Sequence, residues 1–181
     1  MKAKQVLTNK FVSSSFTNLS TSFLLQGSSF FFITLVTFIS PPNQKSEFFV
    51  TYFTAYIFAI FFDFGLNIAT SRLALENNDH SLMRDLYRFK WLVFVAMIPL
   101  SVSLFLLYPS QVFSSALLVG AALNITNCYR QKNIIENNER KALIQISKLA
   151  VCRAIFAFGS IWLSINIQLA MIVSLVIPIF F

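Results

Sequence analysis

Six long runs of apolar residues dominate the sequence and limit what the chain can fold into. They cover roughly residues 14–39, 48–71, 91–108, 110–129, 142–163 and 168–181. A helix that crosses a bilayer needs about 20 mainly apolar residues. The chain is 56% hydrophobic and 12% charged, whereas a soluble domain carries about 25% charged residues. We therefore expect an all-α integral membrane bundle of six transmembrane helices, and neither a disordered chain nor a water-soluble enzyme.

Basic residues alternate between the predicted loops and give the bundle an orientation. One set lies before the first run, one after the second run and one after the fourth run, comprising Lys2, Lys4, Lys10, Arg72, Arg84, Arg88, Lys90, Arg130, Lys132, Arg140 and Lys141. The loops on the opposite side contribute only Lys45. Cytoplasmic loops of membrane proteins carry an excess of Lys and Arg. The pattern predicts a multi-pass protein with a cytoplasmic N-terminus, and it explains the net charge of +7 without nucleic-acid binding.

Polar residues share one face of the second run. They are Tyr52, Tyr56, Asp63, Asn67 and Thr70, and with Ala59 they are spaced three or four residues apart, as one helical face requires. Asp63 lies about nine residues, or ~13 Å, from Arg72 at the predicted membrane edge. A charge at the bilayer centre costs ~2.5–3.5 kcal/mol on insertion scales. Asp63 therefore either makes a structural hydrogen bond between helices or faces a cavity that admits cargo or a coupling ion.

Further polar positions in other runs fit the same cavity. The first run has a polar face made of Ser15, Asn18, Ser22, Gln26 and Ser29. Small hydroxyl residues also allow close helix packing, so that face has two interpretations. In the fourth run, Gly120, Ala121, Asn124 and Asn127 mainly predict close packing. Two polar stripes on consecutive helices nevertheless favour a shared, hydrated crevice.

The fifth run carries two cations, Lys148 and Arg153. Lys148 is near the predicted cytoplasmic end, where its long side chain can reach the headgroups. Arg153 is deeper, at a level comparable to Asp63. It could pair with Asp63 across the bundle, or it could face the cavity and attract an anionic headgroup, since guanidinium matches phosphate oxygens in a two-pronged geometry.

Other motifs carry little chemistry. His80 and Asp85 form an H-x4-D pattern that also occurs in membrane-bound acyltransferases, but no second block of that kind follows. With one histidine and no carboxylate cluster, the sequence predicts no metal site and no cofactor. Cys128 and Cys152 lie in or beside apolar runs and imply no disulfide framework.

One segment resembles a known family. Residues 62–74 read Phe-Asp-Phe-Gly-Leu-Asn-Ile-Ala-Thr-Ser-Arg-Leu-Ala, and they are similar to the end of the second helix in bacterial polysaccharide flippases of the multidrug/oligosaccharidyl-lipid/polysaccharide exporter superfamily. The layout of residues 124–140, an apolar helix ending in Tyr-Arg before a short polar turn, is also similar. Family members often have a Gly-containing turn between helices one and two, where this chain has Pro-Pro-Asn-Gln at 41–44.

The resemblance implies a non-enzymatic transporter of two lobes, of which residues 1–181 form the first. Because the sixth run is still apolar at Phe181, we expect further helices beyond it. The family moves undecaprenyl-diphosphate-linked oligosaccharide across the bacterial inner membrane by alternating access, for O-antigen or capsule biosynthesis. Its partners would be the lipid-linked oligosaccharide, membrane lipids, a polysaccharide polymerase and glycosyltransferases.

The expected pathway residues are Asp63 and Arg153 first, then Tyr52, Tyr56, Asn67, Gln26 and Lys148. The alternatives are a small-molecule or drug exporter of the same superfamily and a membrane-embedded acyltransferase.

Overall fold

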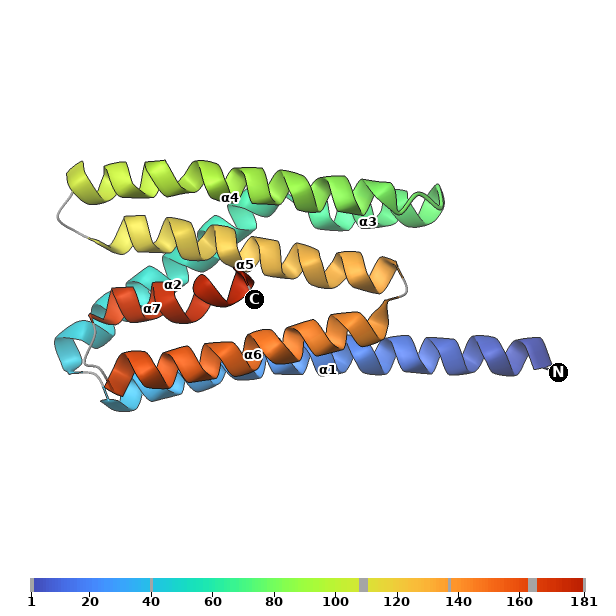
Figure 1. Cartoon of the computed structure of the whole chain (residues 1–181), viewed down its shortest axis with the longest axis horizontal. Helices are drawn as coiled ribbons and strands as arrows, with labels where there is room; N and C mark the ends of the chain where they lie inside the picture. The colour runs from blue at the N-terminus through green and yellow to red at the C-terminus, as the bar shows by residue number, and fades with distance from the viewer. Residues whose placement is uncertain (1, 40, 108–110, 137, 163–165, 181) are drawn as a thin grey trace.

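The structure, a computed structural model, describes residues 2–39, 41–107, 111–136, 138–162 and 166–180, and in these residues the regular structure is all helical (Figure 1). The elements are α1 (Lys2–Ile39), α2 (Pro42–Asp63), α3 (Leu66–Glu76), α4 (Ser81–Leu107), α5 (Gln111–Ile135), α6 (Glu139–Trp162), α7 (Ile167–Leu175) and the 3₁₀ helix η1 (Ile177–Phe180). The predicted all-α class is therefore confirmed, and α1 ends directly before Pro41 and Pro42 as expected.

Five segments of the described chain are long and apolar enough to cross a membrane. They are Leu19–Phe38, Gln44–Glu76, Ser81–Leu107, Gln111–Ile135 and Arg140–Gly159. This finding supports a multi-pass membrane protein. The last predicted run forms α7, whose nine residues span about 13 Å, against about 30 Å for a hydrocarbon core, followed by the short η1.

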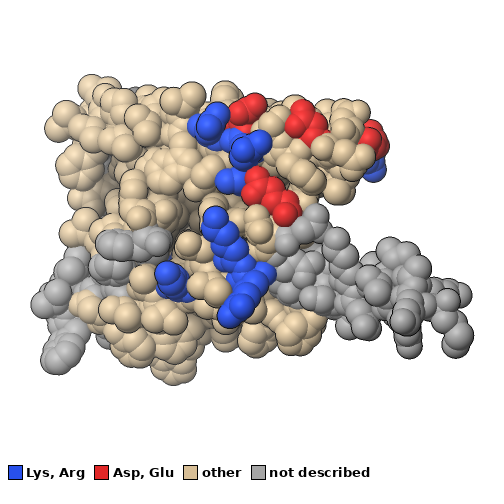
Figure 2. Space-filling model, turned by 45° about the vertical axis from the view of Figure 1, so that its right-hand side comes forward, with Lys and Arg blue, Asp and Glu red and all other residues tan. Residues whose placement is uncertain are grey.

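Helix α5 is largely buried, and the other helices form two groups around it. Helices α2 and α4 pack on α5 with α3 beside them, α1 packs along α6, and α7 lies between α5 and α6. The turn between α3 and α4, the turn between α5 and α6 and the start of α1 lie toward the same end of the bundle (Figure 1). Figure 2 shows charged side chains gathered toward that end and a wide uncharged surface over the rest, as the alternating basic loops predict.

Helices α2 and α5 approach closely at Gly120. A Cβ atom placed there would lie 2.7 Å from the Ala55 carbonyl oxygen and 2.7 Å from the Phe58 Cβ. Small residues let helix backbones approach in membrane bundles, and the buried Ala55 and Ala121 extend the same contact surface. The predicted packing role of this part of α5 is confirmed for Gly120 and Ala121.

The second apolar run is not one continuous helix, and this corrects the expectation for residues 48–71. Helix α2 ends at Asp63, and Phe64 (φ 45°) and Gly65 (φ 72°) both adopt the left-handed conformation before α3 begins. Glycine adopts this conformation without steric cost, whereas a bulky residue there is strained. The Phe64 N–H still donates to the Ile60 carbonyl and so closes the last turn of α2.

Helix α4 begins ten residues earlier than the apolar run suggested, at Ser81. The Asp79 carboxylate accepts hydrogen bonds from the Ser81 hydroxyl (2.6 Å) and the Ser81 N–H (2.9 Å), which satisfies a donor that every helix start leaves unpaired. These bonds hold the pKa of the Asp79 carboxyl below its usual value. Because α4 starts early, the polar residues at 81–90 are helical, and Lys90 is buried in the bundle.

The close approach at Gly120 makes a prediction about stability. Gly120→Ala forces a methyl group against the α2 backbone, so we expect a loss of about 1–3 kcal/mol and a lower melting temperature of the purified chain in detergent. The matched control is Gly27→Ala in α1, where a Cβ meets nothing within 4 Å and alanine favours the helix. Equal melting temperatures for the two variants would contradict the packing described here.

Candidate functional site

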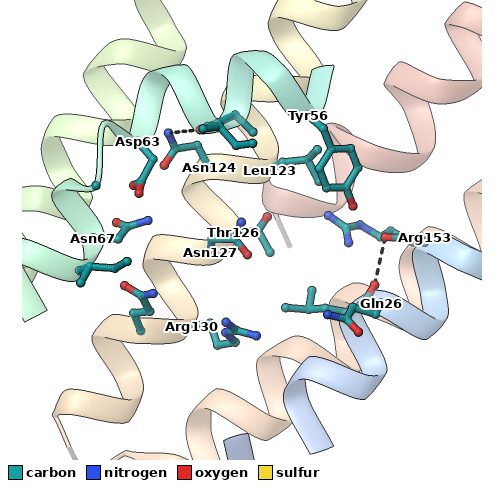
Figure 3. Close-up of a pocket in the computed structure, with 17 residues that line it drawn as sticks. Gln26, Tyr56, Asp63, Asn67, Leu123, Asn124, Thr126, Asn127, Arg130 and Arg153 are labelled. Carbon is teal, nitrogen blue, oxygen red and sulfur yellow. Dashed lines mark hydrogen bonds between the residues drawn. The ribbon is translucent and has the colours of Figure 1, made fainter. Parts of the chain in front are cut away.

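A cavity of about 590 Å³ lies between the two groups of helices. Helix α1 contributes Leu25, Gln26 and Ser29, and α6 contributes Arg153. The other wall comes from α2, the break at Gly65, α3 and α5 (Figure 3). The lining residues fall within candidate membrane spans, so this is a polar hollow inside an otherwise apolar bundle. The crevice expected from polar faces on the first two runs is therefore present as a cavity.

The carboxylate of Asp63 is paired with a lysine that sequence reasoning had placed in a loop. The Lys90 Nζ lies 2.9 Å from Asp63 Oδ1 and donates a second bond to the Phe62 carbonyl at 3.1 Å. Lys90 is 2% exposed, so the ammonium is shielded from bulk solvent, whereas the Asp63 side chain is 24% exposed and lines the cavity. Because the ammonium bonds both a carboxylate and a carbonyl at the C-terminal end of α2, it neutralises Asp63 and stabilises the helix end at the break.

A signal for Lys90 was available in the sequence. The buried face of α4 contains Met83, Leu86, Lys90 and Phe94, which are spaced three or four residues apart. A lysine inside such an apolar stripe is buried with its face, and a buried ammonium needs a partner. The low hydropathy before Trp91 hid this helical pattern.

Arg153 lines the cavity and is 2% exposed. The pairing with Asp63, one of the two expected alternatives, is not present, because Asp63 bonds Lys90 instead. Within the described part of the chain, Arg153 Nε and Nη2 are buried without a hydrogen-bond partner. Figure 3 shows the guanidinium near Tyr56 and on the side of the cavity away from Asp63. The arrangement fits the other alternative, a guanidinium that faces the cavity.

Arg130 is a second cavity cation that sequence reasoning assigned to a loop. It lies in α5, donates from Nη1 to the Ser22 hydroxyl of α1 at 2.8 Å, and has a buried Nε without a partner among the described residues. Its bond to Ser22 links the two walls of the cavity. No ion pair to either Arg130 or Arg153 is found in the described ranges.

The other expected pathway residues divide into two groups. Gln26, Tyr56 and Asn67 line the cavity. Tyr52 does not, but it is buried and its hydroxyl donates to the Tyr56 hydroxyl at 3.2 Å. Lys148 is exposed on α6 and is not brought to the cavity.

Several features of the first helix fall on residues without described side chains. The expected positions Ser15 and Asn18, and the basic residues before them, lie outside the described side chains.

Amide side chains supply hydrogen-bond acceptors on the wall opposite Arg153. Asn67 and Asn124 are buried, and the Oδ1 atom of each is without a partner in the part of the chain that is described. Asn124 donates through Nδ2 to the Ala59 carbonyl at 3.2 Å. Asn127 also lines the cavity. Asn124 and Asn127, which the sequence mainly predicts to be packing residues, therefore also form part of the cavity surface.

The H-x4-D pattern does not form a hydrogen-bonded pair in the described contacts. Asp85 instead lies 3.4 Å from Arg88, and both side chains are exposed. Over the described residues there is no group of three or more His, Cys, Asp or Glu residues that could hold a metal ion, and Cys128 and Cys152 are free.

No protein-family model, no curated protein and no solved structure compared with the chain gives a match. The chemistry of the cavity is therefore the guide to function. The pair of Asp63 and Lys90 is neutral overall, so Arg130 and Arg153 leave the cavity with an excess of positive charge. Unpaired guanidinium donors in a shielded site favour an anionic ligand.

The ion pair makes the second prediction. Lys90→Met leaves the Asp63 carboxylate without its ammonium, so we expect a loss of about 3–5 kcal/mol, measured as a lower melting temperature in detergent. Adding Asp63→Asn should recover most of the loss, because the unpaired charge is then gone. Arg88→Met is the control, since its exposed pair with Asp85 contributes about 0–1 kcal/mol. A double variant no more stable than Lys90→Met would contradict this account.

Proposed function

We propose that the chain is the first lobe of an alternating-access transporter for a lipid-linked oligosaccharide that carries a diphosphate. The observation that carries the proposal is the pair of guanidinium groups, Arg130 and Arg153, which face one cavity without a carboxylate partner in the described residues. Holding two cations without carboxylate partners beside a membrane-depth cavity is costly. An anion with several phosphate oxygens would offset that cost through charge-assisted hydrogen bonds.

The remaining surfaces suit the other parts of such a molecule. The cavity volume of about 590 Å³ lies in the range of small-ligand sites, about 300–1,000 Å³, and its amides can bond sugar hydroxyls. Large apolar side chains outside the cavity lining, such as Phe23, Phe61 and Leu73, are exposed on α1, α2 and α3. A polyprenyl chain would remain in the lipid beside these surfaces while its headgroup enters the cavity.

The charge of the cavity also separates this cargo from the main alternative. Many exported drugs are organic cations, and a cavity with excess positive charge repels them. The diphosphate-linked sugar is therefore preferred over a cationic drug. In this proposal the protein acts as a carrier and not as an enzyme.

Transport requires the cavity to open to each side of the membrane in turn, and the described contacts suggest where the walls would separate. The bond from Arg130 to Ser22 joins α5 to α1, so its rupture would let the two walls separate at the end where the basic loops lie. We place that end and the N-terminus in the cytoplasm of a bacterial cell, at the inner membrane.

The first experiment measures binding of farnesyl diphosphate, a short polyprenyl diphosphate, to the purified 181-residue chain in nanodiscs by titration calorimetry. We expect saturable binding, and Arg153→Met should raise Kd by about 10- to 100-fold, because charge-assisted bonds contribute about 1.5–3 kcal/mol. Arg88→Met, at an exposed arginine outside the cavity, should leave Kd unchanged. Equal loss in both variants, or no binding by the wild-type chain, would contradict the proposal.

A second experiment tests the same claim in the cell that produces the protein. Arg153→Met at the chromosomal locus should lower surface polysaccharide while membrane abundance of the protein stays unchanged. Arg153→Lys should retain part of the function, since it keeps the charge but loses the two-pronged geometry. Normal polysaccharide in the Met variant would remove Arg153 from the pathway.

A further inference from the structure

Hydrogen-bond acceptors gather on one wall of the cavity, at the break between α2 and α3. Asn67 is 4% exposed and Asn124 is 3% exposed, and the Oδ1 atom of each is buried without a partner in the described chain. Asp63 lines the same cavity and gives only Oδ1 to Lys90 in the described contacts. Burying an acceptor without a donor is unfavourable, so this wall is complementary to a ligand that donates hydrogen bonds.

A hydrogen bond to α2 fixes the position of Asn124 near the break. Its Nδ2 atom donates to the Ala59 carbonyl, which lies one helical turn before Asp63 on α2. Asn67 is the second residue of α3, directly after the break. Figure 3 shows Asp63, Asn67 and Asn124 toward one side of the cavity and Arg153 toward the other, with Arg130 between them. The cavity therefore has an acceptor wall and a donor wall.

The charge balance decides which donor fits the acceptor wall. A metal cation would bind oxygen ligands of this kind, but Lys90 already neutralises Asp63 at 2.9 Å. Arg130 and Arg153 add further positive charge to the same cavity, and a further cation would be repelled at low dielectric. Neutral hydroxyl groups satisfy the acceptors without adding charge.

We propose that the acceptor wall, made by Asp63, Asn67 and Asn124, is a hydroxyl-recognition subsite that binds the sugar ring next to the phosphate of the cargo. This inference depends on the proposed function, because it assumes that Arg153 holds the phosphate. The two walls then fix the direction in which the headgroup lies, with phosphate at α6 and sugar at the break in the second span. Cargo without a sugar fills only half of the site.

The test compares two probes on the 181-residue chain in nanodiscs: farnesyl diphosphate, and farnesyl diphosphate that carries one N-acetylhexosamine. For the wild-type chain we expect the sugar-bearing probe to bind about tenfold tighter, as one or two neutral hydrogen bonds provide. Asn67→Leu should bring the ratio of the two Kd values close to one. Asn77→Leu, at an exposed position beyond the end of α3, should keep the ratio near ten.

Two further variants make the result independent of folding defects and of the phosphate site. If Asn67→Leu does not give a folded chain by circular dichroism, Asn67→Ala removes the same acceptor with a smaller side chain and tests the same ratio. Arg153→Met should weaken both probes by a similar factor and keep the ratio.

The outcomes separate the two proposals. Binding of farnesyl diphosphate without any preference for the sugar would overturn the subsite and leave the proposed function standing. Failure of both probes to bind would overturn the proposed function. Tighter binding in NaCl than in choline chloride at equal ionic strength, lost in Asn67→Leu, would show that a cation occupies the acceptor wall and would overturn the subsite.

Discussion

The ion pair between Lys90 and Asp63 is the interaction on which the site depends. It places an ammonium 2.9 Å from a carboxylate in a chain whose other candidate spans offer few charged partners. Separating the two groups would leave an unpaired charge in an apolar bundle, at a cost of several kcal/mol. The same ammonium bonds the Phe62 carbonyl, so it also stabilises the place where the second span is interrupted. The break and the pair therefore support each other.

The break between α2 and α3 matters because it places polar backbone groups and polar side chains inside the bundle. A continuous helix would hide these groups. Non-helical backbone at membrane depth is tolerated where it lines a cavity or is buried in protein, and Gly65 does line the cavity. With Asp63 neutralised by Lys90, the charge that remains available to a ligand is that of Arg130 and Arg153. Lys90 is thus paired with a carboxylate in the fold, whereas Arg130 and Arg153 have no carboxylate partner in the described residues.

Sequence reasoning gave the class and much of the lining, for physical reasons that can be traced. Apolar length predicts membrane helices directly, and the three-and-four spacing places Tyr56 and Asp63 on one face of α2, since that spacing fixes a helical face. Asn67 lines the same cavity from α3, beyond the break, which the spacing does not explain. Arg153 was recognised because a cation at that depth needs an explanation. These properties are local, so they can be predicted from the sequence before the fold is known.

The predictions that the structure corrects concern the ion-pair partner of Asp63 and the ends of the helices. Lys90 and Arg130 were assigned to loops because hydropathy falls near them, although α4 and α5 continue through both. The partner of Asp63 could not be chosen from the sequence, because Arg153 and Lys90 are both possible partners until the helices are placed. The break at Phe64 was missed because a phenylalanine in the left-handed conformation contradicts its ordinary preference, and only the adjacent glycine indicates it.

The most direct measurement of the central claim is a distance between the guanidinium nitrogens of Arg153 and the phosphorus atoms of bound farnesyl diphosphate. Solid-state NMR on the 181-residue chain with ¹⁵N-labelled arginine, in lipid bilayers, measures the dipolar coupling between ¹⁵N and ³¹P. We expect a coupling typical of direct hydrogen bonding, which weakens in Arg153→Met because Arg130 then remains as the other cavity arginine. A bound diphosphate whose coupling to arginine is absent, or unchanged in that variant, would contradict the account.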